Sequence, residues 1–187
     1  MNEVQQLAEK VLGRDPAIEL IEYQRRWISI REMRRVAQAV NTLIDASGAK
    51  ALAPIAFVPR NRPEALATIL GLAATGRYIR MIHPYQSPEG IARDVQRLSP
   101  AVLVALDEDF TPAVVAALKA RGVAGITLKD MNASTITECE RTLGNCEYPT
   151  EPLFDLLTSG TTGPPKQFPI TYDFIANEML KSSENKT

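Results

Sequence analysis

Segments typical of buried strands alternate with segments that begin like helices, and this alternation limits the fold more than any other feature. The strand-like segments are residues 53–58, 78–82, 101–106 and 123–128. Because proline fits the first turn of a helix, the helices between them are predicted to begin at Pro63, Pro88 and Pro112. Strands linked by helices in this way form parallel sheets that are covered on both faces. The sequence therefore predicts an α/β fold, with a layered, largely parallel sheet and flanking helices.

Both ends of the chain carry further elements. The apolar spacing of residues 2–12 predicts an amphipathic helix, and residues 17–23 and 25–30 predict two short strands around a turn at Gln24. Residues 130–152 show no clear periodicity, and we expect a loop or short connector there. The elements predicted after it are two strands and a helix, at residues 153–157, 168–170 and 172 to about 181.

Ser29 and Glu32 form the pattern of a capping box, in which the hydroxyl accepts from a backbone N–H of the first turn and the carboxylate reaches back. The helix that follows has apolar side chains on one face: Met33, Val36, Ala37, Val40, Leu43 and Ile44. Gly48 supplies a stop signal. We therefore expect this helix to run from Ser29 to Gly48 with one face in the core.

Residues 158–166, Thr-Ser-Gly-Thr-Thr-Gly-Pro-Pro-Lys, combine hydroxyl side chains, glycines and a lysine in one short segment. Hydroxyls and successive backbone N–H groups donate to phosphate oxygens, glycine lets the backbone approach a ligand, and lysine adds a positive charge. These are the components of a polyphosphate site. The candidate phosphate-binding residues are Thr158, Ser159, Gly160, Thr161, Thr162, Gly163 and Lys166. We expect direct phosphate contacts from Thr161, Thr162 and Lys166.

This segment differs from a Walker A loop, in which Gly-x-x-x-x-Gly-Lys-Ser/Thr opens a helix. Here Pro164 and Pro165 separate the second glycine from the lysine, and the flanking segments are predicted strands. The loop is therefore expected to join two strands. The alternative is a flexible surface loop rich in Ser, Thr and Gly, which would leave the order of the residues unexplained.

The segment resembles the phosphate-binding signature of the adenylate-forming superfamily, which includes acyl- and aryl-CoA synthetases, peptide-synthetase adenylation domains and firefly luciferase. The order of elements over residues 15–180 is similar to the first part of the large N-terminal domain of acyl-CoA synthetases. The resemblance implies that ATP and Mg²⁺ bind and that a carboxylic acid is activated as an acyl-adenylate and transferred to CoA. It assigns phosphate binding to residues 158–166, and it assigns neither a catalytic residue nor a metal ligand to this chain.

Two positions depart from the family pattern. Gln167 stands where glycine is usual, and Tyr172 stands where a histidine near the acyl site is common. An aromatic ring can still line a pocket there, so we interpret the change as divergence rather than loss of function. The family's adenine, ribose and hinge segments and its C-terminal lid lysine follow the phosphate loop. We therefore expect residues 1–187 to be a partial N-terminal AMP-binding domain that lacks a complete nucleotide pocket and is inactive alone. Apolar surface left uncovered in such a piece would favour self-association.

Three functions stay open at this point. The first is a part of an acid–CoA ligase, for which a fatty acid is the default substrate because the acyl pocket lies downstream of the loop in this family. The second is a piece of a peptide-synthetase adenylation domain, which loads a carrier protein. The third is a non-catalytic relative that binds a partner or nucleotide, which Gln167 and Tyr172 favour.

Charge and hydropathy limit the classes of partner that the chain is expected to bind. The formal net charge is −1, so electrostatics indicate no nucleic-acid partner. The N-terminus lacks the pattern of a signal peptide, and no apolar run reaches the length of a transmembrane segment. We therefore expect a cytoplasmic protein whose partners are a small carboxylate, ATP and CoA.

Other candidate residues have ordinary structural explanations. Cys139 and Cys146 lack enough nearby ligands for zinc and are expected to be structural or incidental. His83, the only histidine, is expected to be a hydrogen-bonded or surface residue, and residues 107–109 to be an acidic turn rather than a Mg²⁺ site. Four arginines are expected to be solvated rather than to form a basic patch: Arg60, Arg62, Arg77 and Arg80.

Overall fold

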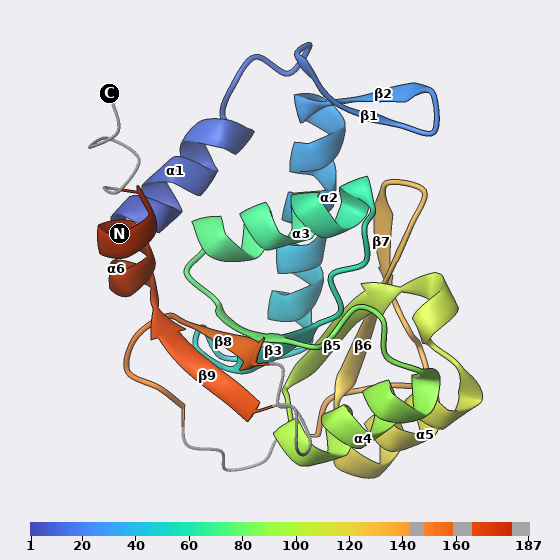
Figure 1. Cartoon of the computed structure of the whole chain (residues 1–187). Coiled ribbons are helices and arrows are strands. Elements are labelled where there is room, and N and C mark those ends of the chain that lie inside the picture. Colours follow the sequence, from blue (N-terminus) through green and yellow to red (C-terminus); the bar gives the residue numbers. More distant parts are fainter. Residues whose placement is uncertain (143–147, 159–165, 181–187) are drawn as a thin grey trace.

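The computed structural model describes residues 1–142, 148–158 and 166–180 (Figure 1). Its main sheet consists of β3 (Pro54–Phe57), β4 (Tyr78–Met81), β5 (Val102–Leu106), β6 (Ala124–Lys129), β7 (Asn132–Thr135), β8 (Leu153–Thr158) and β9 (Lys166–Thr171). These seven strands lie in the order β7-β6-β5-β3-β4-β8-β9. The five inner strands run parallel, and β7 and β9 pair antiparallel at the two sides. The predicted α/β fold with a largely parallel sheet is confirmed.

Helices cover both faces of this sheet (Figure 1). One face carries α1 (Glu3–Leu12), α2 (Ile30–Ala46), α3 (Pro63–Ala74) and α6 (Tyr172–Ile175), and the other carries α4 (Pro88–Leu98) and α5 (Pro112–Arg121). Each face has its own buried core, which includes Val36 and Ile55 on the first face and Ile91 and Leu118 on the second. A separate hairpin is formed by β1 (Glu19–Tyr23) and β2 (Arg26–Ser29). Among the described residues, no helix is long and apolar enough to cross a membrane.

The predicted capping box opens α2. The Ser29 hydroxyl accepts from the backbone N–H of Glu32, and the Glu32 carboxylate accepts from the backbone N–H of Ser29 at 2.9 Å. This hydrogen bond lowers the pKa of Glu32. The chain leaves the helix through Gly48, whose φ is +74°, a conformation that glycine adopts without strain.

The parallel strands of the main sheet begin along one side and end along the opposite side. The carboxyl edge is the one where the parallel strands β3, β4, β5, β6 and β8 end, and the amino edge is the opposite one, where they begin. β3 and β5 are neighbours, yet α3 follows β3 onto one face and α5 follows β5 onto the other. In open α/β sheets, ligands bind outside the carboxyl ends of the strands at such a switch point.

The expectation of a loop over residues 130–152 is wrong at its start, where β7 lies. Asp130 and Met131 have φ values of +48° and +56° and form a tight turn, so that Lys129 pairs with Asn132. The strand was missed because its residues are polar and largely exposed, which leaves no apolar run to detect. A methionine with positive φ is also not a usual turn signal.

Candidate functional site

The predicted phosphate loop connects two paired strands. β8 and β9 are antiparallel, with Thr158 directly opposite Lys166, which confirms the prediction that strands flank the loop. Because β8 runs parallel to β4, Thr158 lies at the carboxyl edge. The other candidate residues lie outside the described part of the chain: Ser159, Gly160, Thr161, Thr162 and Gly163. The structure thus places the first and last signature residues side by side at the edge where α/β sheets bind ligands.

A buried polar cluster anchors β8 below the loop. Tyr78 donates its hydroxyl to Asp155 Oδ2 at 2.6 Å, and Arg80 Nε lies 3.0 Å from the same oxygen. Arg80 also donates to the Leu98 carbonyl at the end of α4 at 2.6 Å. Burial, and then the bond to Asp155, raise the pKa of Tyr78 to about 12. The cluster ties β8 to β4 and α4. In the sequence it is indicated only by Asp155, a carboxylate within an otherwise apolar strand.

Gln167 fits an ordinary strand position. Its φ is not among the positive values of the described residues, so the backbone here does not require the glycine that is usual in the family. Its side-chain Nε2 donates to the Met81 carbonyl at 3.4 Å, which links the start of β9 to the end of β4. The departure from the family pattern is therefore compatible with the hairpin that carries the loop.

Tyr172 packs in the core. The residue is 1% exposed, and its ring lies 5.1 Å from that of Phe154 between centroids. Its hydroxyl donates to the Arg77 carbonyl at 2.8 Å. Tyr172 therefore fastens α6 to the amino edge, and burial raises its pKa.

Arg60 and Arg62 lie on the loop after β3, and both face carboxylates of the turn after β5. Arg60 forms an ion pair with Asp109 and donates to the Pro84 carbonyl, and the hydrogen bond with Asp109 raises the pKa of Arg60. Arg62 lies 4.0 Å from Glu108. The expectation of a solvated charge is wrong for Arg60, which serves to fasten the turn after β5 to the loop after β3.

Arg77 belongs to the amino edge instead. It is 6% exposed, lies 2.5 Å from Asp45 and donates Nε to Asn41 Oδ1 at 3.2 Å. This arginine is therefore neither solvated nor near the candidate site, and it joins the start of β4 to α2.

Residues 107–109 form a short 3-10 turn, as the sequence predicts. Lys129 donates to Asp107 at 2.7 Å and lowers the pKa of that carboxyl. His83 Nδ1 accepts from the backbone N–H of Tyr85 at 3.2 Å, which confirms a hydrogen-bonded histidine. Within residues 1–142, 148–158 and 166–180, no three His, Cys, Asp or Glu side chains gather as metal ligands.

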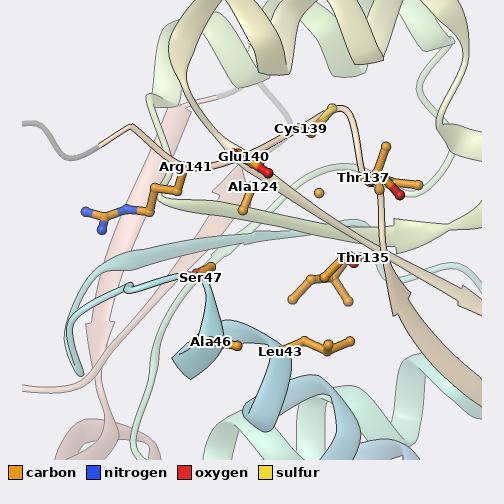
Figure 2. Close-up of a pocket in the computed structure, with 12 residues that line it drawn as sticks. Leu43, Ala46, Ser47, Ala124, Thr135, Thr137, Cys139, Glu140 and Arg141 are labelled. Carbon is orange, nitrogen blue, oxygen red and sulfur yellow. The ribbon is translucent and has the colours of Figure 1, made fainter.

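A cavity of about 360 Å³ lies away from the loop (Figure 2). It is bounded by the end of α2, the first half of β6 and residues 135–141. Cys139 is buried, burial raises the pKa of its thiol, and its Sγ lies 4.0 Å from the Val115 carbonyl of α5. The Arg141 side chain extends away from the cavity (Figure 2). This cavity is thus near the amino edge and separate from the candidate site; Cys146 lies outside the described residues.

Comparison with known proteins adds independent findings. The family described as AMP-binding enzyme matches residues 7–187. D-alanine–D-alanyl carrier protein ligase of Streptococcus pyogenes serotype M3 (strain SSI-1) is 25% identical over 147 residues, which are 76% of this chain and 26% of the relative. The chain thus spans about a quarter of the length of the curated relatives it matches.

Solved structures show the same fold. ATP-bound MatB from Rhodopseudomonas palustris superposes with a TM-score of 0.73 at 21% identity, over 98% of this chain and 38% of that chain. The anthranilate CoA ligase AuaEII, in complex with anthranoyl-AMP, superposes with a TM-score of 0.61 at 16% identity, over 94% of this chain and 36% of that chain. At these identities the likeness establishes the architecture alone.

Proposed function

The chain belongs to the AMP-binding enzyme family of adenylate-forming ligases, and from this premise we propose that it carries the phosphate-binding loop of an ATP-dependent acid–thiol ligase. The observation that carries the proposal is the pairing of Thr158 with Lys166 at the carboxyl edge. It supports a loop that opens where parallel strands end, as nucleotide sites in α/β sheets do.

In this proposal the loop holds the β- and γ-phosphates of ATP. Hydroxyls, backbone N–H groups and Lys166 stabilise the negative charge that grows on departing pyrophosphate. Mg²⁺ would share that charge and would be held mainly through the phosphates, which is common for this ion. The Asp155 cluster supplies the rigid support, because it fixes the strand that leads into the loop.

We propose that the complete enzyme activates a carboxylic acid as an acyl-adenylate and transfers it to CoA. A fatty acid is the substrate class to test first, although no described residue distinguishes it from other acids. The short span relative to the matched proteins supports a partial domain, so we expect the 187-residue chain to be inactive alone.

A carrier protein is the second candidate acceptor. The likeness to D-alanine–D-alanyl carrier protein ligase favours it. An assay of thioester formation with CoA and with a phosphopantetheinylated carrier protein, side by side, distinguishes the two acceptors.

An exposed apolar surface supports the self-association of this piece. Leu156, Phe168 and Phe174 are 41%, 56% and 53% exposed on β8, β9 and α6. β9 is also the last strand of the described sheet on its side. The unpaired backbone groups of such an edge strand pair readily with a strand of another chain. Sedimentation should show association that Phe168→Ser weakens; a monomer at all concentrations would contradict this proposal.

The test of the ligase proposal is ATP–pyrophosphate exchange by the full-length gene product. Lys166→Ala should lower the exchange rate about 100-fold, the usual scale for losing one group that stabilises a transition-state charge. Lys119→Ala is the matched control, because Lys119 is an exposed lysine of α5 that pairs with Glu138. An unchanged rate in Lys166→Ala would rule out the assigned role of the loop.

A further inference from the structure

The hairpin that carries the phosphate loop extends beyond its pairing with the rest of the sheet. Among the described residues, the pairing of β8 with β4 ends at Asp155, whereas its pairing with β9 continues to Thr158, which lies opposite Lys166. Residues 156–158 and 166–168 therefore form a two-stranded arm, about 10 Å long at the usual rise of a strand. Two strands alone are marginally stable, so the position of the end of this arm depends on additional contacts.

Gln167 joins the arm to β4. Its side-chain Nε2 donates to the carbonyl of Met81, the last residue of β4, at 3.4 Å. The described pairing of β4 with β8 ends one residue earlier, at Arg80, so this hydrogen bond lies where the arm separates from β4. β9 and β4 are the two neighbours of β8 in the sheet. The Gln167 side chain thus connects β9 to β4 across the strand between them.

This connection acts on the residue next to the phosphate-binding lysine. Lys166 and Gln167 are consecutive in β9, so their side chains extend from opposite faces of the strand. Lys166 is exposed. Gln167 therefore holds the backbone from one face at the point from which the Lys166 side chain extends on the other. A group that is already held in place loses less conformational entropy when a ligand binds.

The Gln167 amide contributes little to the stability of the fold as a whole. Its Oε1 is buried and has no hydrogen-bond partner in the described structure, while its Nε2 forms the bond to Met81. The cost of a buried acceptor without a donor is comparable to the net gain from one hydrogen bond, so the two effects nearly cancel. The bond therefore serves the position of the arm more than the free energy of unfolding.

We propose that Gln167 is a positioning residue for the phosphate loop, holding the arm against β4 so that Lys166 is in place before a polyphosphate binds. This inference rests on the proposed function, which assigns phosphate binding to Lys166. Glycine, the usual residue at this position in the family, has no side chain that could form the bond. The positioning is therefore a property of this chain.

The first test needs no ligand and compares the 187-residue chain with Gln167→Met, which keeps the length of the side chain and removes its amide. In ¹⁵N relaxation, the order parameters of the Thr158 and Lys166 amides should fall from about 0.85 to about 0.6. The denaturation midpoint should stay the same. The matched control is Gln38→Met, at an exposed glutamine of α2, which should change neither. Unchanged order at both amides, or a loss of order throughout the sheet with a lower midpoint, would overturn the proposal.

The second test is titration of the same proteins with Mg²⁺ and tripolyphosphate. Gln167→Met should raise the dissociation constant about fivefold, the scale of the net contribution of one hydrogen bond. Gln167→Asn, whose amide is too short to reach Met81, should act in the same direction and serves if the methionine variant folds poorly. Equal affinity in the wild type and both variants would refute the positioning role and leave the ligase proposal intact. A wild type that does not bind would refute the phosphate assignment instead, and the order parameters would still decide whether Gln167 holds the arm.

Discussion

The two edges of the main sheet use polar residues in different ways. At the amino edge they fasten elements together: Arg77 binds Asp45 and Asn41, and Tyr172 binds the Arg77 carbonyl. At the carboxyl edge the chain passes from β8 into the predicted phosphate loop, where Thr158 pairs with Lys166. Polar residues also fasten elements at the carboxyl edge, as the Arg60–Asp109 ion pair does; this is in addition the edge to which the proposed function assigns binding, as expected for parallel α/β sheets.

The largest effect should come from crowding the amino edge at Gly122, which ends α5. Its φ is +59°, and an added Cβ would lie 1.4 Å from Thr142 Oγ1. Gly122→Ala should lower the free energy of unfolding by about 3 kcal/mol through backbone strain and overlap. Gly48→Ala is the control, because φ there is +74° with nothing within 4 Å; it should cost about 1 kcal/mol. Equal losses in chemical denaturation would contradict the packing described at Gly122.

Matched arginine substitutions compare the edges directly. Arg77→Met should cost about 2 kcal/mol, because a buried side chain loses hydrogen bonds to Asn41 and Asp45. Arg62→Met should cost about 0.5 kcal/mol, because its pair with Glu108 is long and partly exposed. Denaturant titration of both variants measures the difference. A larger loss of unfolding free energy in Arg62→Met than in Arg77→Met would contradict the conclusion that Arg77 is the more important of the two for stability.

A pH-dependent effect, confined to the alkaline range, should appear through Tyr78. Its pKa is raised from 10.0 to about 12, so the folded protein holds the phenol proton that the unfolded chain releases. The resulting stability is present below pH 10 and is lost as the pH rises towards 12. Over this range, stability should fall about 1.4 kcal/mol per pH unit more steeply in the wild type than in Tyr78→Phe. Tyr85→Phe, at an 81% exposed position, should keep the wild-type slope.

Much of the fold was predictable because its elements carry local signals. The capping box at Ser29 and Glu32 and the turn at Gln24 were predicted correctly, and so were the apolar strands. β7 was not, because its polar residues acquire strand structure by pairing with β6 rather than from their own pattern. The periodic spacing of apolar residues reveals elements that bury one face. β7 is mostly exposed, so its sequence shows no such spacing.

Of the candidate site, only the residues of the phosphate-binding signature were predictable from the sequence. The signature indicated Thr158 and Lys166, and their pairing follows from the flanking strands. The role of Asp155 depends on a partner that is 77 residues away in the sequence, Tyr78. No local pattern could indicate such contacts, and the same holds for Tyr172, whose place in the core depends on Phe154 and Arg77.

The most direct test of the central claim is an NMR titration of the chain with Mg²⁺ and tripolyphosphate, which probes the phosphate loop without the rest of a nucleotide pocket. The amides of Thr158, Lys166 and Gln167 should shift, while those of Arg77 and Gly122 at the amino edge should not. Shifts confined to the amino edge, or no shift at the β8–β9 hairpin at saturating tripolyphosphate, would contradict the assignment of phosphate binding to residues 158–166.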